Sequence, residues 1–236
     1  MSDDERIELA IRNTRVLRPP RQTLATFGNT NIHYYLVTEP IYEGLDSEPK
    51  EPAGRETVVR EGKVVAERPR VVTPHYLVNV EGFSEHARRY INKLMQEQGA
   101  NVPGIFYNYK NEPKELSIVS SDLESVARRI SDQIDKEGNP LAAIIKGSDE
   151  LWDVSLLKFI FEMTHNSLSS NIYEMGSRGL LDIDRGGMPR DARITIERLF
   201  YQVQKGEVDP SDLKLELDRW GVFKEYEDRF LRLFRK

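Results

Sequence analysis

Cysteine is absent from this chain of 236 residues. The absence excludes disulfides, thiolate nucleophiles, and zinc or iron–sulfur sites held by cysteine. Long apolar runs are also absent: residues 141–145 form one of the longest, whereas a membrane-spanning helix needs roughly 20 apolar residues. Residues 1–6 are acidic and lack the basic start and apolar stretch of a signal peptide. We therefore expect a soluble, cytoplasmic protein without a membrane segment.

The common signatures of catalysis and nucleotide binding are missing too. The sequence contains no Walker A loop, no G-x-G-x-x-G, no H-E-x-x-H, no G-x-S-x-G and no EF-hand loop. It therefore identifies no family, no reaction and no cofactor, and it leaves open whether the chain is an enzyme.

Positive charge is in deficit overall. The chain has 34 Lys and Arg against 39 Asp and Glu, which gives a formal net charge of −5. A dedicated nucleic-acid binder usually carries a basic surplus, so contact with an anionic partner would have to be local. Hydrophobic residues make up 39% of the chain and include 10 Tyr, 9 Phe and 2 Trp, which predicts a folded rather than a disordered protein.

The first 146 residues mix strand-like and helical patterns. Glu61-Gly62 predicts the turn of a hairpin between strands at 57–60 and 63–66. Runs rich in β-branched and aromatic residues predict further strands at 23–27, 32–38, 71–80, 105–109, 116–119 and 141–145. Apolar residues at helical spacing predict helices at 5–17, 85–98 and 121–136.

From Ser148 onward the apolar spacing is helical, and Pro189 and Asp209-Pro210 mark the starts of two helices. We therefore predict an α+β fold: a mixed or antiparallel sheet with flanking helices, followed by a helical C-terminal subdomain. The predicted boundaries are 1–146 for the α+β core and 147–236 for the helical subdomain, either as separate domains or packed as one unit.

The most unusual local feature is a strip of arginines near the N-terminus. Between residues 10 and 38 there is no acid, yet arginine recurs at every third position as Arg12, Arg15, Arg18 and Arg21. The pattern places Arg12 and Arg15 on one helix face and the other two in extended chain. Guanidinium groups form bidentate hydrogen bonds with phosphates and carboxylates, so the strip predicts a local site for an anionic ligand or nucleic acid.

His33 and Tyr35 follow the strip and could add polar and stacking contacts to such a site. A structural alternative is that the arginines form ion pairs with the acidic loop predicted at 39–54, or with the acids of a second subunit.

Two groups of residues are candidate metal ligands. Glu162 and His165 are three residues apart on a predicted helix, the spacing that places two ligands on one face. Asp182 and Asp184 are two residues apart beside a pair of glycines, an arrangement that could hold a magnesium ion against a phosphate. The simpler alternatives are a polar helix end for the first pair and loop contacts with arginines for the second.

Two further patterns suggest catalysis less directly. Glu61-Gly62-Lys63, preceded by Asp46, has the acid and Glu-x-Lys order of one class of metal-dependent nuclease. The predicted hairpin tip argues against it, because that chemistry needs the pair inside a sheet. His33 and His75 both lie in predicted strands and could form a general acid/base pair, or be hydrogen-bonded histidines of a half-buried sheet.

The end of the chain carries a stripe of aromatic residues: Trp220, Phe223, Tyr226, Phe230 and Phe234. Exposing them all would be costly, so the stripe either closes the helical subdomain or packs against a second copy in a homodimer. Taken together, the sequence favours a binding or assembly protein that contacts an anionic partner. The alternative is a metal-dependent enzyme acting on a phosphate-containing or nucleic-acid substrate.

Overall fold

The structure is a computed structural model that describes residues 2–40, 56–81 and 84–234. Its contacts divide the chain into two compact units, each built from two stretches of chain: Met1–Arg68 with Tyr107–Asn171, and Pro69–Phe106 with Ile172–Lys236. The predicted α+β class is confirmed, with a mixed five-stranded sheet, flanking helices and a helical C-terminal region. Among the described residues, no helix has both the length and the apolar character that crossing a membrane requires.

The first unit is organised around the five-stranded sheet, whose strand order is β1-β7-β2-β3-β6. Neighbouring strands run antiparallel except β2 and β7, which are parallel. Its elements are α1 (Asp3–Asn13), β1 (Arg15–Arg18), β2 (Thr30–Thr38), β3 (Thr57–Ala66), β6 (Tyr109–Val119), α4 (Leu123–Glu137), β7 (Ala142–Lys146) and most of α5 (Trp152–Ser177).

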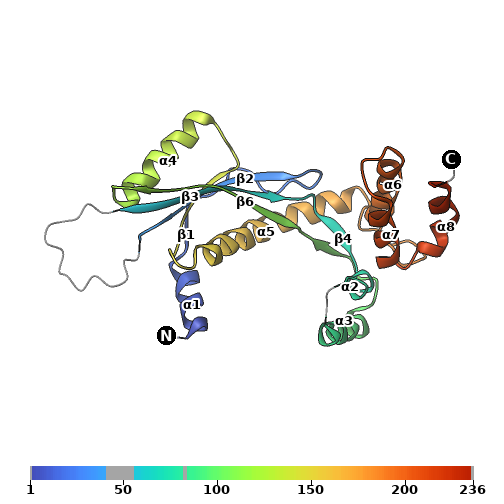
Figure 1. Cartoon of the computed structure of the whole chain (residues 1–236). Coiled ribbons are helices and arrows are strands. Elements are labelled where there is room, and N and C mark those ends of the chain that lie inside the picture. Colours follow the sequence, from blue (N-terminus) through green and yellow to red (C-terminus); the bar gives the residue numbers. More distant parts are fainter. Residues whose placement is uncertain (1, 41–55, 82–83, 235–236) are drawn as a thin grey trace. The chain divides into compact units, whose positions relative to one another are not determined.

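Two helices bury the two faces of this sheet (Figure 1). On one face, α4 contributes Val126 and Ile134 to a core cluster with residues of β2, β3 and β7. On the other face, α5 packs Leu156 and Phe159 against β2, β3 and β7. Since β7 is buried on both faces along residues 142–145, these four residues are all apolar, in agreement with the buried strand predicted at 141–145.

Gly62 explains why the hairpin predicted at Glu61-Gly62 is wrong. β3 is continuous from Thr57 to Ala66 and pairs along its length with β2 and β6. Tyr34 lies directly opposite Gly62 on β2 and is buried. A Cβ atom at residue 62 would overlap the Tyr34 ring, lying 2.5 Å from Cζ. The glycine therefore leaves room for a buried ring and does not make a turn.

The helix predicted at 5–17 is also shorter than expected. α1 ends at Asn13 because Thr14 adopts an extended backbone, with its hydroxyl bonded to Ala10 O and to Ser155 Oγ. The next residues form β1, so Arg12 and Arg15 do not share a helix face. Two more predictions are wrong. Residues 23–27 form no strand, and residues 110–114, which separate the strands predicted at 105–109 and 116–119, lie within β6.

The second unit is mainly helical. Its elements are β4 (Arg70–Val72), α2 (Pro74–Val78), α3 (Glu85–Gln98), β5 (Gly104–Phe106), the end of α5, α6 (Arg190–Gln204), α7 (Pro210–Arg219) and α8 (Phe223–Arg232). The strand predicted at 71–80 is wrong beyond Val72, because Thr73 caps the short helix α2. Asp209 caps α7 and Pro210 opens it, as predicted.

The C-terminal aromatic stripe belongs to the core of this second unit. Trp220 and Phe230 are buried, Phe223 and Tyr226 are partly buried beside them, and only the terminal Phe234 is largely exposed. The stripe therefore closes its own unit, the first of its two predicted roles. The boundary predicted between residues 146 and 147 stays a prediction, while the contacts group residues 69–106 with the C-terminal helices.

The role of Gly62 gives a test of the sheet. We expect Gly62→Ala to lower the free energy of unfolding by about 1–3 kcal/mol, because the added methyl group must displace a buried ring. Gly28→Ala is the matched control, since a Cβ atom there meets nothing within 4 Å. Chemical denaturation measures both. Equal stability of the two variants would contradict the close approach of residue 62 to Tyr34.

Candidate functional site

Within the described part of the chain, the arginines of the strip differ in whether they have protein partners. Arg18 binds the carboxylate of Asp135 on α4 with both terminal nitrogens, at 2.6 and 3.0 Å, and also bonds Ser131 Oγ at 2.7 Å. Arg21 reaches the same carboxylate at 2.7 Å. The hydrogen bond from Arg18 is the largest cause of a lowered pKa at Asp135. These two arginines therefore tie β1 and the following loop to α4.

Arg18 and Arg21 thus form ion pairs within the protein, as the structural alternative for the strip predicts. Their partner, Asp135, is not one of the acids that the sequence suggested. Most of the acidic loop predicted at 39–54 lies outside the described residues, so its pairing with the strip stays a prediction. Arg12 is exposed on α1, where its guanidinium lies 3.7 Å from the carboxylate of Glu8.

Arg15 lines a cavity of about 520 Å³ at one end of the sheet. It lies on β1 directly opposite Lys146, the last residue of β7. The rest of the lining comes from Asn13, Glu39, Pro40, Gly147, Ser148 and Asp149. Since β2 and β7 are parallel, the residues that follow both strands meet at this edge. In open α/β sheets this edge, at the carboxyl ends of parallel strands, is the usual place for ligands.

The charges of this cavity are unequally satisfied. Asp149 accepts hydrogen bonds from Arg60 at 2.8 Å and from Thr38 at 2.7 Å, so a cation already neutralises it. In the part of the chain that the structure describes, Arg15 and Lys146 have no ion pair and no side-chain hydrogen bond. Glu39 is exposed at the rim. Two adjacent cations thus face the cavity without a protein partner among the described residues.

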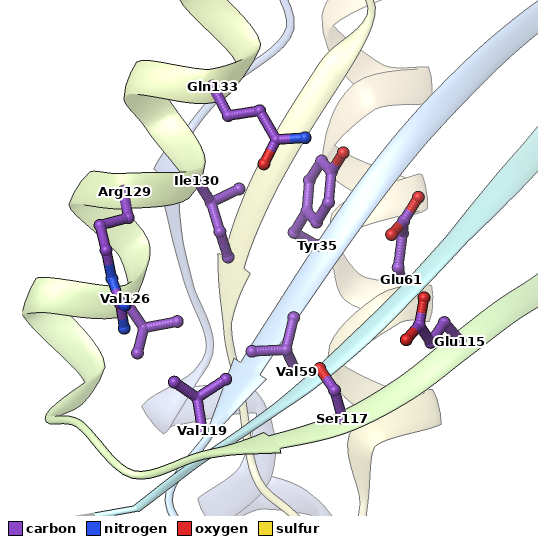
Figure 2. Close-up of a pocket in the computed structure, with 10 residues that line it drawn as sticks. All are labelled: Tyr35, Val59, Glu61, Glu115, Ser117, Val119, Val126, Arg129, Ile130 and Gln133. Carbon is purple, nitrogen blue, oxygen red and sulfur yellow. The ribbon is translucent and has the colours of Figure 1, made fainter.

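A second concave site lies between α4 and the strands β3 and β6, as Figure 2 shows. This groove of about 250 Å³ has an apolar floor and a polar rim, formed by Tyr35, Val59, Glu61, Glu115, Ser117, Val119, Val126, Arg129, Ile130 and Gln133. Glu61 and Glu115 are directly opposite each other across the two strands. Lys114 forms an ion pair with Glu61 and so reduces their repulsion.

The other two residues predicted to accompany the arginines lie apart from the cavity. Tyr35 lines the groove, where burial first and the charge of Glu61 second raise its pKa. His33 is exposed on β2, opposite Lys63. The predicted anion site is thus not one cluster: Arg15 alone lines the cavity, joined by a lysine that the sequence analysis did not select.

The candidate metal ligands are held by other partners. Glu162 forms an ion pair with Lys158 at 2.7 Å, while the His165 ring stacks on Phe161. Across residues 2–40, 56–81 and 84–234 there is no group of three His, Asp or Glu side chains suited to a metal ion.

Asp184 organises its own loop. It accepts hydrogen bonds from the Gly186 and Met188 amides, at 2.8 and 3.0 Å, and from Arg193 at 2.8 Å. Burial alone would raise the pKa of Asp184, but the bonds from Met188 and Arg193 outweigh it and lower the pKa. Asp182 is exposed nearby, and its carbonyl accepts the Arg190 amide at 2.9 Å.

The predicted hairpin tip is the argument against the nuclease-like pattern at Glu61 and Lys63, and this prediction is wrong. Both residues lie inside the sheet on continuous β3. However, Glu61 pairs with Lys114, Lys63 pairs with Glu112 at 2.8 Å, and Asp46 lies outside the described residues.

The predicted pairing of His33 with His75 rested on two strands, and the second of these strands is a helix. His33 is on β2 of the first unit, and His75 is on α2 of the second unit.

Sequence reasoning missed Lys146 and Asp135. Lys146 ends a strand whose other residues are all buried, and Gly147 follows it. A single cation at the end of an apolar run is a signal in the sequence that could have identified Lys146 as a candidate binding residue. Asp135 had no such signal, because its bond with Arg18 joins residues 117 positions apart.

The second unit also holds a carboxylate that was not predicted. Glu216 is buried and accepts hydrogen bonds from Tyr76 Oη and Trp220 Nε1, each at 3.1 Å, besides its pair with Arg70. All of these partners belong to the same unit. A buried charge with several donors holds elements together, so we assign Glu216 a structural role.

The chain matches no known family, and no curated protein or solved structure is significantly similar to it. The cavity and the groove are therefore the features of the described residues that bear on function.

The clamp between Arg18 and Asp135 predicts a pH-dependent stability. A lowered folded-state pKa contributes stability at neutral pH that is lost as pH falls below the ordinary value of 3.8. Asp135→Asn should therefore melt at a lower temperature than wild type at about pH 7, and the difference should shrink toward about pH 2.5. Thermal melts across this range measure it. Asp132→Asn on the same helix is the control, and a pH-independent difference at Asp135 would contradict the clamp.

Proposed function

We propose that this chain binds a compact anion of the phosphate class in the cavity between Arg15 and Lys146. One observation carries the proposal: two cations line a single cavity, and neither has a partner among the described residues. The chemistry fits, because a guanidinium and an ammonium together supply several donors and two positive charges to phosphate oxygens.

The position of the two cations supports a ligand between them. Arg15 and Lys146 are direct cross-strand partners in the β1–β7 pair. Like charges directly opposite each other destabilise a sheet, and a bound anion would convert that repulsion into attraction. Asp149 also lines the cavity but does not neutralise the two cations, because Arg60 and Thr38 already engage its carboxylate.

The backbone that follows Lys146 also supports the proposal. Gly147 follows the strand so closely that a Cβ atom there would lie 2.6 Å from Ser155 Oγ on α5. Any larger residue would push the chain away from α5. The glycine thus keeps Ser148 and the two cations at one edge of the cavity, which is large enough for a phosphate and part of the group that carries it.

This local site is compatible with the net charge of −5. Of the two acids that line the cavity, Asp149 is neutralised by Arg60, while Glu39 is exposed at the rim, so two cations without an ion pair among the described residues stand against one exposed carboxylate. The local potential can therefore be positive while the whole chain is acidic.

Calorimetric titration with inorganic pyrophosphate at low salt tests the proposal. We expect Arg15→Glu and Lys146→Glu each to weaken binding by at least about tenfold, since a hydrogen bond to a charged group contributes about 1.5–3 kcal/mol. Arg128→Glu, which makes the same charge change at an exposed site on α4, is the matched control and should bind like wild type.

Two results would refute the anion site. One is wild-type protein that binds neither pyrophosphate nor a short single-stranded oligonucleotide at low salt. The other is equal weakening by all three substitutions, which would indicate a general charge effect. Binding of the oligonucleotide alone, abolished by the two cavity variants and weakened by added salt, would identify the anion as nucleic acid.

A metal-dependent enzyme acting on a phosphate-containing or nucleic-acid substrate is the alternative. Its proposed ligands, Glu162 with His165 or Asp182 with Asp184, have little support because Glu162 and Asp184 already bind Lys158 and Arg193. We expect about 1 mM Mg²⁺, Mn²⁺ or Zn²⁺ to leave the thermal midpoint unchanged. A midpoint raised by one of these ions, and lost in Asp184→Asn or Glu162→Gln, would favour the enzyme.

We further propose that the chain self-associates as a symmetric dimer, the commonest form of soluble oligomer. The aromatic stripe that suggested dimerisation packs within its own unit, so another surface has to supply the contact. Large apolar side chains are exposed elsewhere on the first unit, at Leu116 and Ile118 of β6 and at Leu157 and Phe161 of α5. A cytoplasmic location stays a prediction.

A further inference from the structure

Strand β6 forms one edge of the five-stranded sheet. Among the described residues, no strand pairs with its outer side. An edge strand presents unpaired N–H and C=O groups and is a template for another strand. Proteins usually protect such edges with proline, lysine or a bulge.

Only the first half of β6 has this protection. Lys110, Pro113 and Lys114 lie in residues 109–114, and the register with β3 shifts between Glu61 and Gly62, which leaves Lys114 as a bulge. The second half, residues 115–119, has the sequence Glu-Leu-Ser-Ile-Val and pairs regularly with β3. It contains no proline, no lysine and no bulge.

The unprotected half also exposes apolar side chains. Leu116 is 60% exposed and Ile118 is 61% exposed. Because side chains alternate along a strand, both lie on the same face of the sheet, while Ser117 and Val119 face the groove under α4. Two large aliphatic residues beside an open backbone edge mark a surface that association would cover.

We propose that residues 115–119 of β6 pair antiparallel with the same residues of a second copy. This inference rests on the self-association proposed above and names the surface that carries it. The dimer would have one continuous sheet with five strands from each copy.

The segment is self-complementary in one register. The register has a two-fold axis that is perpendicular to the sheet and passes between the two Ser117 residues. This axis places the same face of both copies on the same side of the joint sheet. Leu116 of the first copy then lies opposite Ile118 of the second copy, and Ile118 of the first copy lies opposite Leu116 of the second. Glu115 lies opposite Val119 of the second copy, so no like charges are opposed.

Another exposed apolar surface of the first unit, on α5, offers no comparable feature. Leu157 and Phe161 are 64% and 72% exposed, and Phe161 already stacks on His165. Their helix has no open backbone edge, and nothing indicates what would cover it. Leu157 therefore supplies a matched control: the same residue type with nearly the same exposure as Leu116, on a different element.

Sedimentation equilibrium tests which surface is used. A pairing of five residues buries less area than a standard interface, so we expect a weak dimer that accumulates as protein concentration rises to about 200 µM. Wild type and Leu157→Lys should approach twice the 27.3 kDa of one chain. Leu116→Lys should remain a monomer with an unchanged circular dichroism spectrum.

Cysteine crosslinking tests the register. Since the chain has no cysteine, Ser117→Cys introduces a single thiol that lies at the two-fold axis. Directly opposite residues have Cα atoms about 4.5–5.5 Å apart, which a disulfide can span. Mild oxidation should crosslink Ser117→Cys rapidly, whereas Lys110→Cys, exposed on the protected half of the same strand, should stay monomeric.

The outcomes separate the surface from self-association itself. A monomeric wild type at all concentrations refutes both. A wild-type dimer that persists in Leu116→Lys, or that is lost only in Leu157→Lys, refutes the β6 edge while self-association stands. Crosslinking of Lys110→Cys as fast as Ser117→Cys refutes the register. Anion binding by Arg15 and Lys146 is unaffected by any of these results.

Discussion

The parallel pairing of β2 with β7 is the constraint on which the first unit depends. A parallel neighbour has to be reached by a crossover, and α4 provides it, so one sheet face is covered by α4 while the other is left for α5. The same pairing brings the residues after both strands to one edge. β1 pairs with the other side of β7, and this pairing places Arg15 directly opposite Lys146. The cavity is therefore a consequence of strand order, not of a local motif.

Ion pairs decide which charges of this acidic chain are available to a ligand. Asp135 engages Arg18 and Arg21, and Arg60 engages Asp149 while lying over the Trp152 ring at 5.7 Å. These pairs are partly exposed, so their main effect is geometric: they hold the N-terminal segment and the start of α5 in place. Among the residues that the structure describes, Arg15 and Lys146 are the cations at the cavity that form no ion pair. The arginine strip is thus mostly structural, and its one binding candidate acts with a lysine from another strand.

The sequence predicted the elements whose signals are local. The helix predicted at 85–98 is α3, Asp209-Pro210 starts α7, and the apolar run at 141–145 predicted the buried strand β7. It failed where a residue serves a distant partner: Gly62 makes room for Tyr34 and looked like a turn. Thr14 ends α1 through a bond to Ser155, and Asp135 is joined to Arg18 by the tertiary fold alone. Half of the cavity's cationic pair, Arg15, was selected from sequence. Its partner was not, because register across β1 and β7 cannot be read from either segment.

The central claim is that Arg15 and Lys146 form an anion site at the end of β7. The most direct measurement follows backbone amide chemical shifts of isotope-labelled protein during titration with pyrophosphate. The account predicts saturable changes centred on Gly147, Ser148 and the residues flanking Arg15, with the groove beside Tyr35 unperturbed. Changes centred on the groove, or none that saturate, would contradict it.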